Sequence, residues 1–169
     1  MSQQNTPKTS IDVRLANADD AEALAHREPN PDASFAEKHF ELQEQGDYFL
    51  VVGFVGGELG GYVVLDCREE TDLRPEMKNL WVYPEFRRRG LGAALSQYLE
   101  TLASRHGFDE IQLGVDPENP AAIPMYIGLD YTPTGHHRVA TYLTIAEDGT
   151  ETEVKGHDAI YRKSLRISA

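Results

Sequence analysis

Residues 80–95 read LWVYPEFRRRGLGAAL. Four strand-forming residues lead up to Pro84, and an apolar helix pattern opens directly after two glycines. Gly90 and Gly92 have no Cβ, so the backbone there can come close to a ligand. The first amides of a helix have no partner inside it and lie at the positive end of its dipole, which favours an anion. With the arginines at 87–89, the stretch predicts a strand, a phosphate-binding turn and a helix.

Two other phosphate-binding motifs do not fit this stretch. A Walker A loop needs a Lys-Ser or Lys-Thr pair after its last glycine, where this chain has Ala93-Ala94. A dinucleotide fingerprint needs a third glycine three residues after the second, where this chain has Leu95. The arrangement that fits is Arg87-x-x-Gly90-x-Gly92, preceded by Val82-x-Pro84. This arrangement resembles the coenzyme A motif of the GNAT superfamily of N-acetyltransferases.

Two further segments resemble the same family. Residues 13–21, VRLANADDA, resemble its first strand and the start of its first helix. The spacing Asn119-x-x-Ala122-x-x-Met125-Tyr126 resembles its Asn-x-x-Ala-x-x-Leu-Tyr helix. The chain departs from the family at Asp130-Tyr131, where members usually carry a Gly-Phe pair. The resemblance extends over residues 11–165, which is most of the chain.

Hydrophobic periodicity predicts the elements between these motifs. The expected strands cover residues 11–15, 48–55, 58–66, 77–82 and 111–115, then about 137–145 and 158–165. The expected helices run from Asn17 or Asp19 to about 25, from Asp32 or Ser34 to about 46, from 91 to 105 and from about 121 to 126. Tight turns are expected at Gly56-Gly57 and at Glu147-Asp148-Gly149.

The order β-α-α-β-β-β-α-β-α-β-β is that of the family's fold. The resemblance therefore implies one α+β GNAT domain over residues 11–166, with a mixed, mostly antiparallel twisted sheet and helices on both faces. Residues 1–10 are polar and are expected to form a disordered tail.

The charge of the chain limits its partners. A net charge of −12 disfavours nucleic acid and anionic membranes; it could attract a cationic amine or simply keep the protein soluble. No apolar run approaches the roughly 20 residues needed to span a bilayer, and the N-terminus lacks the apolar core of a signal peptide. One cysteine, Cys67, allows no internal disulfide and fits a reducing cytoplasm. A cytoplasmic protein without a metal site is expected, and both a monomer and a homodimer stay open.

The resemblance also implies which residues contact acetyl-CoA, the acyl donor. In the family, a bulge in the strand before the phosphate-binding turn exposes backbone amides to the acetyl carbonyl and the pantetheine arm. The implied contacts are the amides of Leu80, Trp81 and Val82, the turn residues Arg87, Arg88, Arg89, Gly90, Leu91, Gly92 and Ala93 for the phosphates, and Asn119 for the pantetheine arm.

Two residues are implied as catalytic. Tyr126 corresponds to a tyrosine whose hydroxyl points at the coenzyme A sulfur, and a phenol with a reference pKa of about 10 keeps its proton at neutral pH. Glu76 stands where several histone acetyltransferases of the family carry a catalytic glutamate, and it could take the amine's proton through water. His136, His137 or a water chain remain alternative bases, whereas Cys67 does not resemble a family nucleophile.

The expected function is transfer of an acetyl group from acetyl-CoA to a primary amine, directly within a ternary complex. The alternative is a non-catalytic module of the same fold that holds acyl-CoA as a sensor or as a partner subunit. The acceptor is expected to be a small molecule or a peptide. No motif in residues 26–34, or in the loop between the last two strands, identifies the acceptor or the preferred acyl chain.

Overall fold

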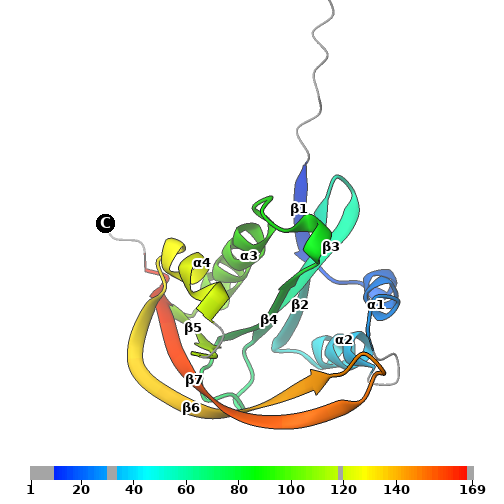
Figure 1. Ribbon diagram of the computed structural model, residues 1–169. Helices are drawn as coiled ribbons and strands as arrows, with labels where there is room; N and C mark the ends of the chain where they lie inside the picture. Colours follow the sequence, from blue (N-terminus) through cyan, green and yellow to red (C-terminus); the bar gives the residue numbers. More distant parts are fainter. Residues whose placement is uncertain (1–9, 30–33, 118–119, 167–169) are drawn as a thin grey trace, which may run out of the picture.

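The computed structural model describes residues 10–29, 34–117 and 120–166 (Figure 1). The strands are β1 (Ile11–Leu15), β2 (Tyr48–Val55), β3 (Glu58–Asp66), β4 (Glu76–Val82), β5 (Glu110–Val115), β6 (Thr132–Ile145) and β7 (Glu151–Ser164). The helices are α1 (Ala18–Ala25), α2 (Phe35–Gln45), α3 (Leu91–Arg105) and α4 (Ile123–Gly128), with short 3-10 helices η2 (Pro84–Phe86) and η3 (Pro120–Ala122). Of the tail expected at residues 1–10, residues 1–9 lie outside the described residues.

Within the described residues, the strands join one seven-stranded sheet in the order β1-β2-β3-β4-β5-β7-β6. Neighbouring strands are antiparallel except β4 and β5, which are parallel. Figure 1 shows α1 and α2 on one side of this sheet and α3 on the other, with α4 beside α3. The α+β fold with a mixed, mostly antiparallel sheet and helices on both faces is therefore confirmed.

Two consecutive residues of β2 show how the sheet separates the helix layers. Tyr48 stacks on His39 of α2, with 5.6 Å between ring centroids. Phe49 contacts His106, just after α3, with 4.8 Å between centroids. Successive side chains of a strand point to opposite faces, so α2 and α3 pack on opposite faces of the sheet.

Helix α3 lies unusually close to the sheet because two glycines face it. A Cβ at Gly53 would lie 2.6 Å from Leu91 Cδ1, and one at Gly60 would lie 2.7 Å from Leu91 Cδ2. Leu95 and Leu99 follow Leu91 at helical spacing, and all three are buried. This packing fixes where α3 begins, and hence where the turn before it lies.

The last hairpin is much longer than its sequence suggested. Strands β6 and β7 each span 14 residues, whereas only residues 137–145 and 158–165 were predicted. The register runs from Thr132 opposite Arg162 to Ile145 opposite Glu151. Residues 151–155 of β7 are all exposed. With no buried face, this stretch lacks the alternation of apolar and polar residues that predicts a strand. Figure 1 shows this hairpin curving toward the side of the sheet that carries α1 and α2.

The predicted boundaries of the helix before β6 were also wrong. Instead of one helix over residues 121–126, the 3-10 turn η3 precedes α4, which continues to Gly128. Asp130 adopts a positive φ of 70°, a conformation that glycine adopts without strain. Tyr131 is fully buried beside Tyr126. The departure from the usual Gly-Phe pair is thus accommodated without loss of the fold.

Candidate active site

Strand β4 carries the expected bulge. Its pairing with β3 passes from Tyr62 opposite Trp81 to Val64 opposite Lys78, so β4 has one residue more than β3 in this interval. Asn79 within it has a positive φ of 58°. The bulge re-aims the backbone of β4 just before the glycine-containing turn.

Strands β4 and β5 separate immediately after they meet. Within the described residues, Glu76 opposite Gln112 is their one registered pair, and the Gln112 amide donates to the Pro75 carbonyl at 3.1 Å. The Tyr83 amide donates to Gly60 of β3 at 2.9 Å. Amides alternate in direction along a strand, so the Val82 amide points away from β3, into the split between β4 and β5.

Beyond the split lies a row of backbone amides at the start of α3. Among the described residues, no hydrogen-bond acceptor is found for the amides of residues 88–93, and the first helical bond is from Ala94 to the Gly90 carbonyl at 3.1 Å. Arg88 and Gly90 both have positive φ, 64° and 86°. When residues of positive φ alternate with residues of negative φ, successive amides turn toward one point. The helix dipole adds positive potential there. The row is suited to bind an anion.

The three arginines of the turn differ in what they contact. Arg87 Nε donates to the Val82 carbonyl at 3.0 Å, and its guanidinium lies 4.7 Å from the Trp81 ring centroid. Arg89 lies 5.8 Å from the Phe86 ring centroid. Arg87 therefore ties the turn to the end of β4, while Arg88 and Arg89 remain exposed and add positive charge beside the amides.

Helix α4 brings Tyr126 to the same region. A Cβ at Gly92 would lie 3.1 Å from Met125 Sδ and 3.9 Å from Val82 Cγ2. The end of β4, the start of α3 and α4 therefore meet around Gly92. Tyr126 is buried, and burial raises the pKa of its hydroxyl to about 12. Asn119, expected to bind the pantetheine arm, lies outside the described residues.

Glu76 is buried, and its carboxylate accepts hydrogen bonds from other side chains. It is therefore not a solvated residue at the start of a strand. Its side chain has a relative accessibility of 6%. Thr71 Oγ1 donates to Oε1 at 2.5 Å, and Arg138 Nη2 donates to Oε2 at 2.5 Å. Arg138 Nε also lies 3.8 Å from Oδ2 of Asp158, a second buried carboxylate. Arg138 thus links β6 to β4 through Glu76.

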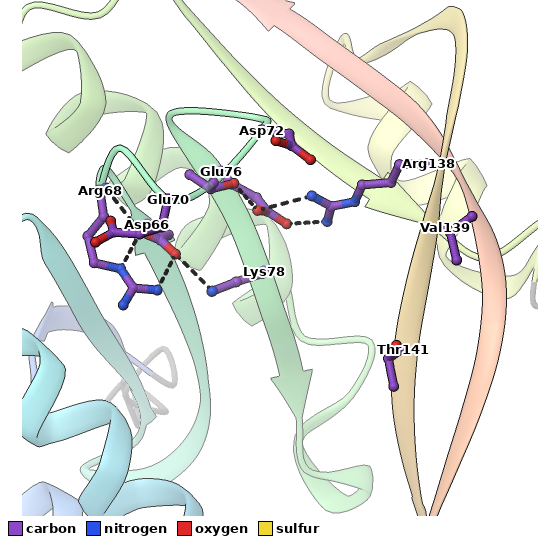
Figure 2. Close-up of a pocket in the computed structure, with 10 residues that line it drawn as sticks. Asp66, Arg68, Glu70, Asp72, Glu76, Lys78, Arg138, Val139 and Thr141 are labelled. Carbon is purple, nitrogen blue, oxygen red and sulfur yellow. Dashed lines mark hydrogen bonds and ion pairs between the residues drawn. The ribbon is translucent and has the colours of Figure 1, made fainter.

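This ion pair forms part of a cavity of about 370 Å³ (Figure 2). The cavity lies between β6 and the segment that joins β3 to β4. It is lined by Asp66, Arg68, Glu70, Thr71, Asp72, Glu76, Lys78, Arg138, Val139 and Thr141. Lys78, which lines the cavity, directly precedes the bulge of β4.

The remaining candidates from the sequence are less suited to catalysis. His136 and His137 are exposed on β6. Cys67 is buried, and burial raises the pKa of its thiol to about 11, which keeps it in the unreactive protonated form at neutral pH.

Sequence reasoning missed Thr71 and Arg138. Both contact Glu76, but Arg138 is 62 residues away in the chain, and it stands in a polar stretch without a motif. The adjacent residues His136 and His137 mark this stretch only as a source of alternative bases. No local signal identifies Arg138 as the partner of Glu76.

The described residues contain neither a membrane-spanning helix nor a cluster of metal ligands. No helix there combines the length and the apolarity needed to cross a membrane. Nor do three or more His, Cys, Asp or Glu side chains gather there in a way that could hold a metal ion.

Known proteins similar to this chain are acetyltransferases. A model of the acetyltransferase (GNAT) family matches residues 15–131. An acetyltransferase of Pectobacterium atrosepticum is 31% identical over 134 residues, which cover 72% of this chain and 87% of the relative. The L-2,4-diaminobutyric acid acetyltransferase of Nocardia farcinica is 35% identical over 79 residues, which cover 45% of this chain but only 39% of that protein.

A solved structure shows the same fold. The putative acetyltransferase yncA of Salmonella typhimurium, determined with its cofactor acetyl-CoA, superimposes with a TM-score of 0.68. The two sequences are 19% identical, and the match covers 95% of this chain and 97% of that one. The split sheet, the amide row before α3 and the family match over most of the chain lead to one conclusion: this chain belongs to the acetyltransferase (GNAT) family.

Proposed function

We propose that this protein transfers the acetyl group of acetyl-CoA to a primary amine. The observation that carries the proposal is the split between β4 and β5, which ends beside a row of amides without acceptors. A long ligand with a phosphate end and a carbonyl end can satisfy both features at once. Acetyl-CoA has this shape, and the similar Salmonella structure contains it.

In this proposal the donor is bound mainly by backbone. The pyrophosphate lies on the amides of residues 88–93, with Arg88 and Arg89 adding charge. The pantetheine arm passes between β4 and β5. The acetyl carbonyl accepts a hydrogen bond from the amide of Val82, which polarises the thioester. Leu80 and Trp81 complete the strand against which the arm lies.

Transfer then requires one bond to form and one to break. The neutral amine attacks the acetyl carbon, the carbon–sulfur bond breaks, and the thiolate takes a proton from the Tyr126 hydroxyl. Burial raises the pKa of Tyr126 to about 12, so its hydroxyl stays protonated at neutral pH and can donate to the sulfur, and the tyrosinate then regains a proton from solvent. A direct transfer of this kind needs no protein nucleophile, in agreement with the raised pKa of Cys67.

Glu76 is proposed to receive the proton that the amine loses. Both of its oxygens are occupied, so the amine does not reach it directly. Thr71 lines the same cavity and donates to Glu76 Oε1. Its hydroxyl can accept a proton from the amine, directly or through water, while passing its own to Glu76.

The acceptor is proposed to be a small or peptidic primary amine that is cationic before reaction. The net charge of −12 attracts cations over a Debye length of about 10 Å at 0.1 M salt. The Nocardia relative is an acetyltransferase of a diamino acid. A second candidate function is a non-catalytic acyl-CoA sensor, which is favoured by the occupied oxygens of Glu76.

An assay of thiol release separates the enzyme from the sensor. Acetyl-CoA is mixed with cationic, neutral and anionic amines at low and high salt, and free coenzyme A is measured over time. We expect amine-dependent release, fastest with cationic amines and slower at high salt because salt screens the attraction. Tight acetyl-CoA binding without release by any amine would favour the sensor. A preference for amines of net negative charge would contradict the proposed acceptor class.

The amide row is tested by Gly90→Val, measured by calorimetry with acetyl-CoA. Valine is strained at the positive φ of Gly90, so the turn must change conformation and its amides no longer point toward one position. We expect at least a roughly 10-fold loss of affinity, equivalent to about 1.4 kcal/mol. Gly107→Val is the matched control, because Gly107 has the same φ of 86° at the other end of α3 with open space around it. Equal affinity in both variants would reject the amide row as the phosphate site.

Tyr126→Phe tests the proposed acid. Turnover should fall roughly 10²-fold, at the lower end of the range for acid catalysis, while the affinity for acetyl-CoA changes little. In the wild type, no loss of rate from deprotonation of Tyr126 is expected until the pH approaches its raised pKa of about 12. Unchanged turnover in the variant, with chemistry shown to limit the rate, would reduce Tyr126 to a packing role.

Glu76→Gln tests the proposed base. The amide keeps the size of the side chain but cannot accept the proton, so we expect turnover to fall roughly 10²-fold or more. Thermal unfolding of the same variant measures its structural effect separately. A variant that is less stable but keeps the wild-type rate would show that Glu76 only anchors Arg138.

A further inference from the structure

Asp66 on the wall of the cavity is saturated with donors. It is 1% exposed. Its oxygens accept hydrogen bonds from Arg68 Nε at 2.9 Å, from Arg68 Nη2 at 2.8 Å and from Lys78 Nζ at 2.9 Å, and the Arg68 amide adds a fourth at 3.0 Å. A carboxylate has about four acceptor positions. Asp66 therefore has no capacity left for the remaining donors of the two cations.

Those remaining donors belong to side chains that line the cavity, and they are available to a ligand there. Two cations share one carboxylate, and both donate to the same oxygen, Oδ2, so they lie within two hydrogen-bond lengths of each other. Among the described residues, no acceptor is found for Arg68 Nη1, nor a second one for Lys78 Nζ. Both side chains are about 28–29% exposed and line the cavity (Figure 2).

Both cations also lie against the ring of Tyr48. The guanidinium of Arg68 and the ammonium of Lys78 lie over its ring, 4.8 Å and 5.2 Å from the centroid. Its hydroxyl is hydrogen-bonded to His39 Nδ1. Burial, followed by the charges of Lys78 and Arg68, lowers the pKa of His39 to about 4, although Asp66 acts in the opposite direction. His39 is therefore neutral at physiological pH and does not add to this charge.

Simple neutralisation of Asp66 does not require two cations. The hydrogen bonds of Arg68 and Lys78 outweigh the effect of burial and lower the pKa of Asp66 to about 2, so it remains a full negative charge at neutral pH. One cation would balance it. The donors that Arg68 and Lys78 have left over are therefore available to an anionic group of a ligand in the cavity.

We propose that Arg68 and Lys78 bind the carboxylate of the acceptor, which is therefore an amino acid and not a simple amine. This inference rests on the proposed function and makes its acceptor more specific. Lys78 immediately precedes the bulge of β4, so a carboxylate held there places the attached amine within a few bonds of the split that receives the thioester. A bidentate Arg contact and a Lys contact are the usual partners of such a group.

The opposite charge lies at the rim of the same cavity. Glu70 and Asp72 are exposed, and among the described residues no cation forms an ion pair with either. An acceptor with one carboxylate and two ammonium groups complements both parts of the cavity. It also carries a net positive charge, so the negative net charge of the protein attracts it. A diamino monocarboxylic acid has this pattern.

The first test compares acceptors that differ only in the carboxylate. Lysine, ornithine and 2,4-diaminobutyric acid are each assayed against their carboxamide and their decarboxylated diamine at saturating acetyl-CoA. We expect the free acid to be preferred about 10- to 100-fold in kcat/KM, the range for one or two charge-assisted hydrogen bonds.

The second test uses Lys78→Gln, with Lys38→Gln as the control of equal charge. Lys38 is exposed on α2 and does not line the cavity. Lys78→Gln should raise KM for the free acid about 10-fold more than KM for the carboxamide, while any change in kcat is the same for both acceptors. A structural role would instead lower the rates with both acceptors together.

The outcomes separate this inference from the function on which it rests. If the wild type acetylates the free acids and their carboxamides equally, or acetylates only amines without a carboxylate, the carboxylate subsite is rejected while the acetyltransferase activity stands. If no amine releases coenzyme A, the proposed function fails and this inference fails with it.

Discussion

Strands β4 and β5 pair at Glu76 and Gln112 and then diverge, and the rest of the site is arranged around this divergence. A strand edge that faces a gap keeps backbone amides and carbonyls without partners, which is costly unless water or a ligand satisfies them. The bulge at Asn79 increases the twist of β4 at this point. The turn before α3 then continues the row of free amides beyond the sheet. Binding of an extended ligand would complete the hydrogen bonding that the fold itself leaves open.

Charge has a different role on the two sides of the split. The donor side uses backbone amides and exposed arginines, which suit phosphates. The side proposed to bind the acceptor contains two buried carboxylates. Asp66 is paired with the nearby Arg68 and with Lys78 of β4, and Glu76 is paired with Arg138 of β6. Breaking such a buried pair by removing one partner is strongly destabilising. These pairs therefore stabilise the arrangement of the segments around the cavity, and Arg138 in particular holds the long β6–β7 hairpin against β4.

The parts of the fold that were predictable from the sequence are those encoded locally. The Gly56-Gly57 turn adopts positive φ at both residues, and Asn17 caps α1 through a reciprocal pair with Asp20. The turn before α3 and the apolar stripe of that helix are likewise contiguous in sequence. Each of these features depends on residues a few positions apart, so periodicity and motif spacing were sufficient.

The parts that were not predictable depend on distant contacts. Glu76 was identified as a candidate, but its partner Arg138 lies 62 residues away on a hairpin whose exposed residues show no strand pattern. The cationic pair on Asp66 is similar, because Lys78 is brought to Asp66 only by the register of β3 and β4. Sequence spacing carries no information about such pairs before the sheet is assembled.

The most direct test of the account is a crystal structure of the protein with acetyl-CoA bound. The account predicts that the pyrophosphate lies on the amides of residues 88–93. It also predicts that the thioester carbonyl lies in the split, about 3 Å from the Val82 amide nitrogen, with the sulfur facing the Tyr126 hydroxyl. Acetyl-CoA bound elsewhere, or a split closed by continued pairing of β4 with β5, would contradict it.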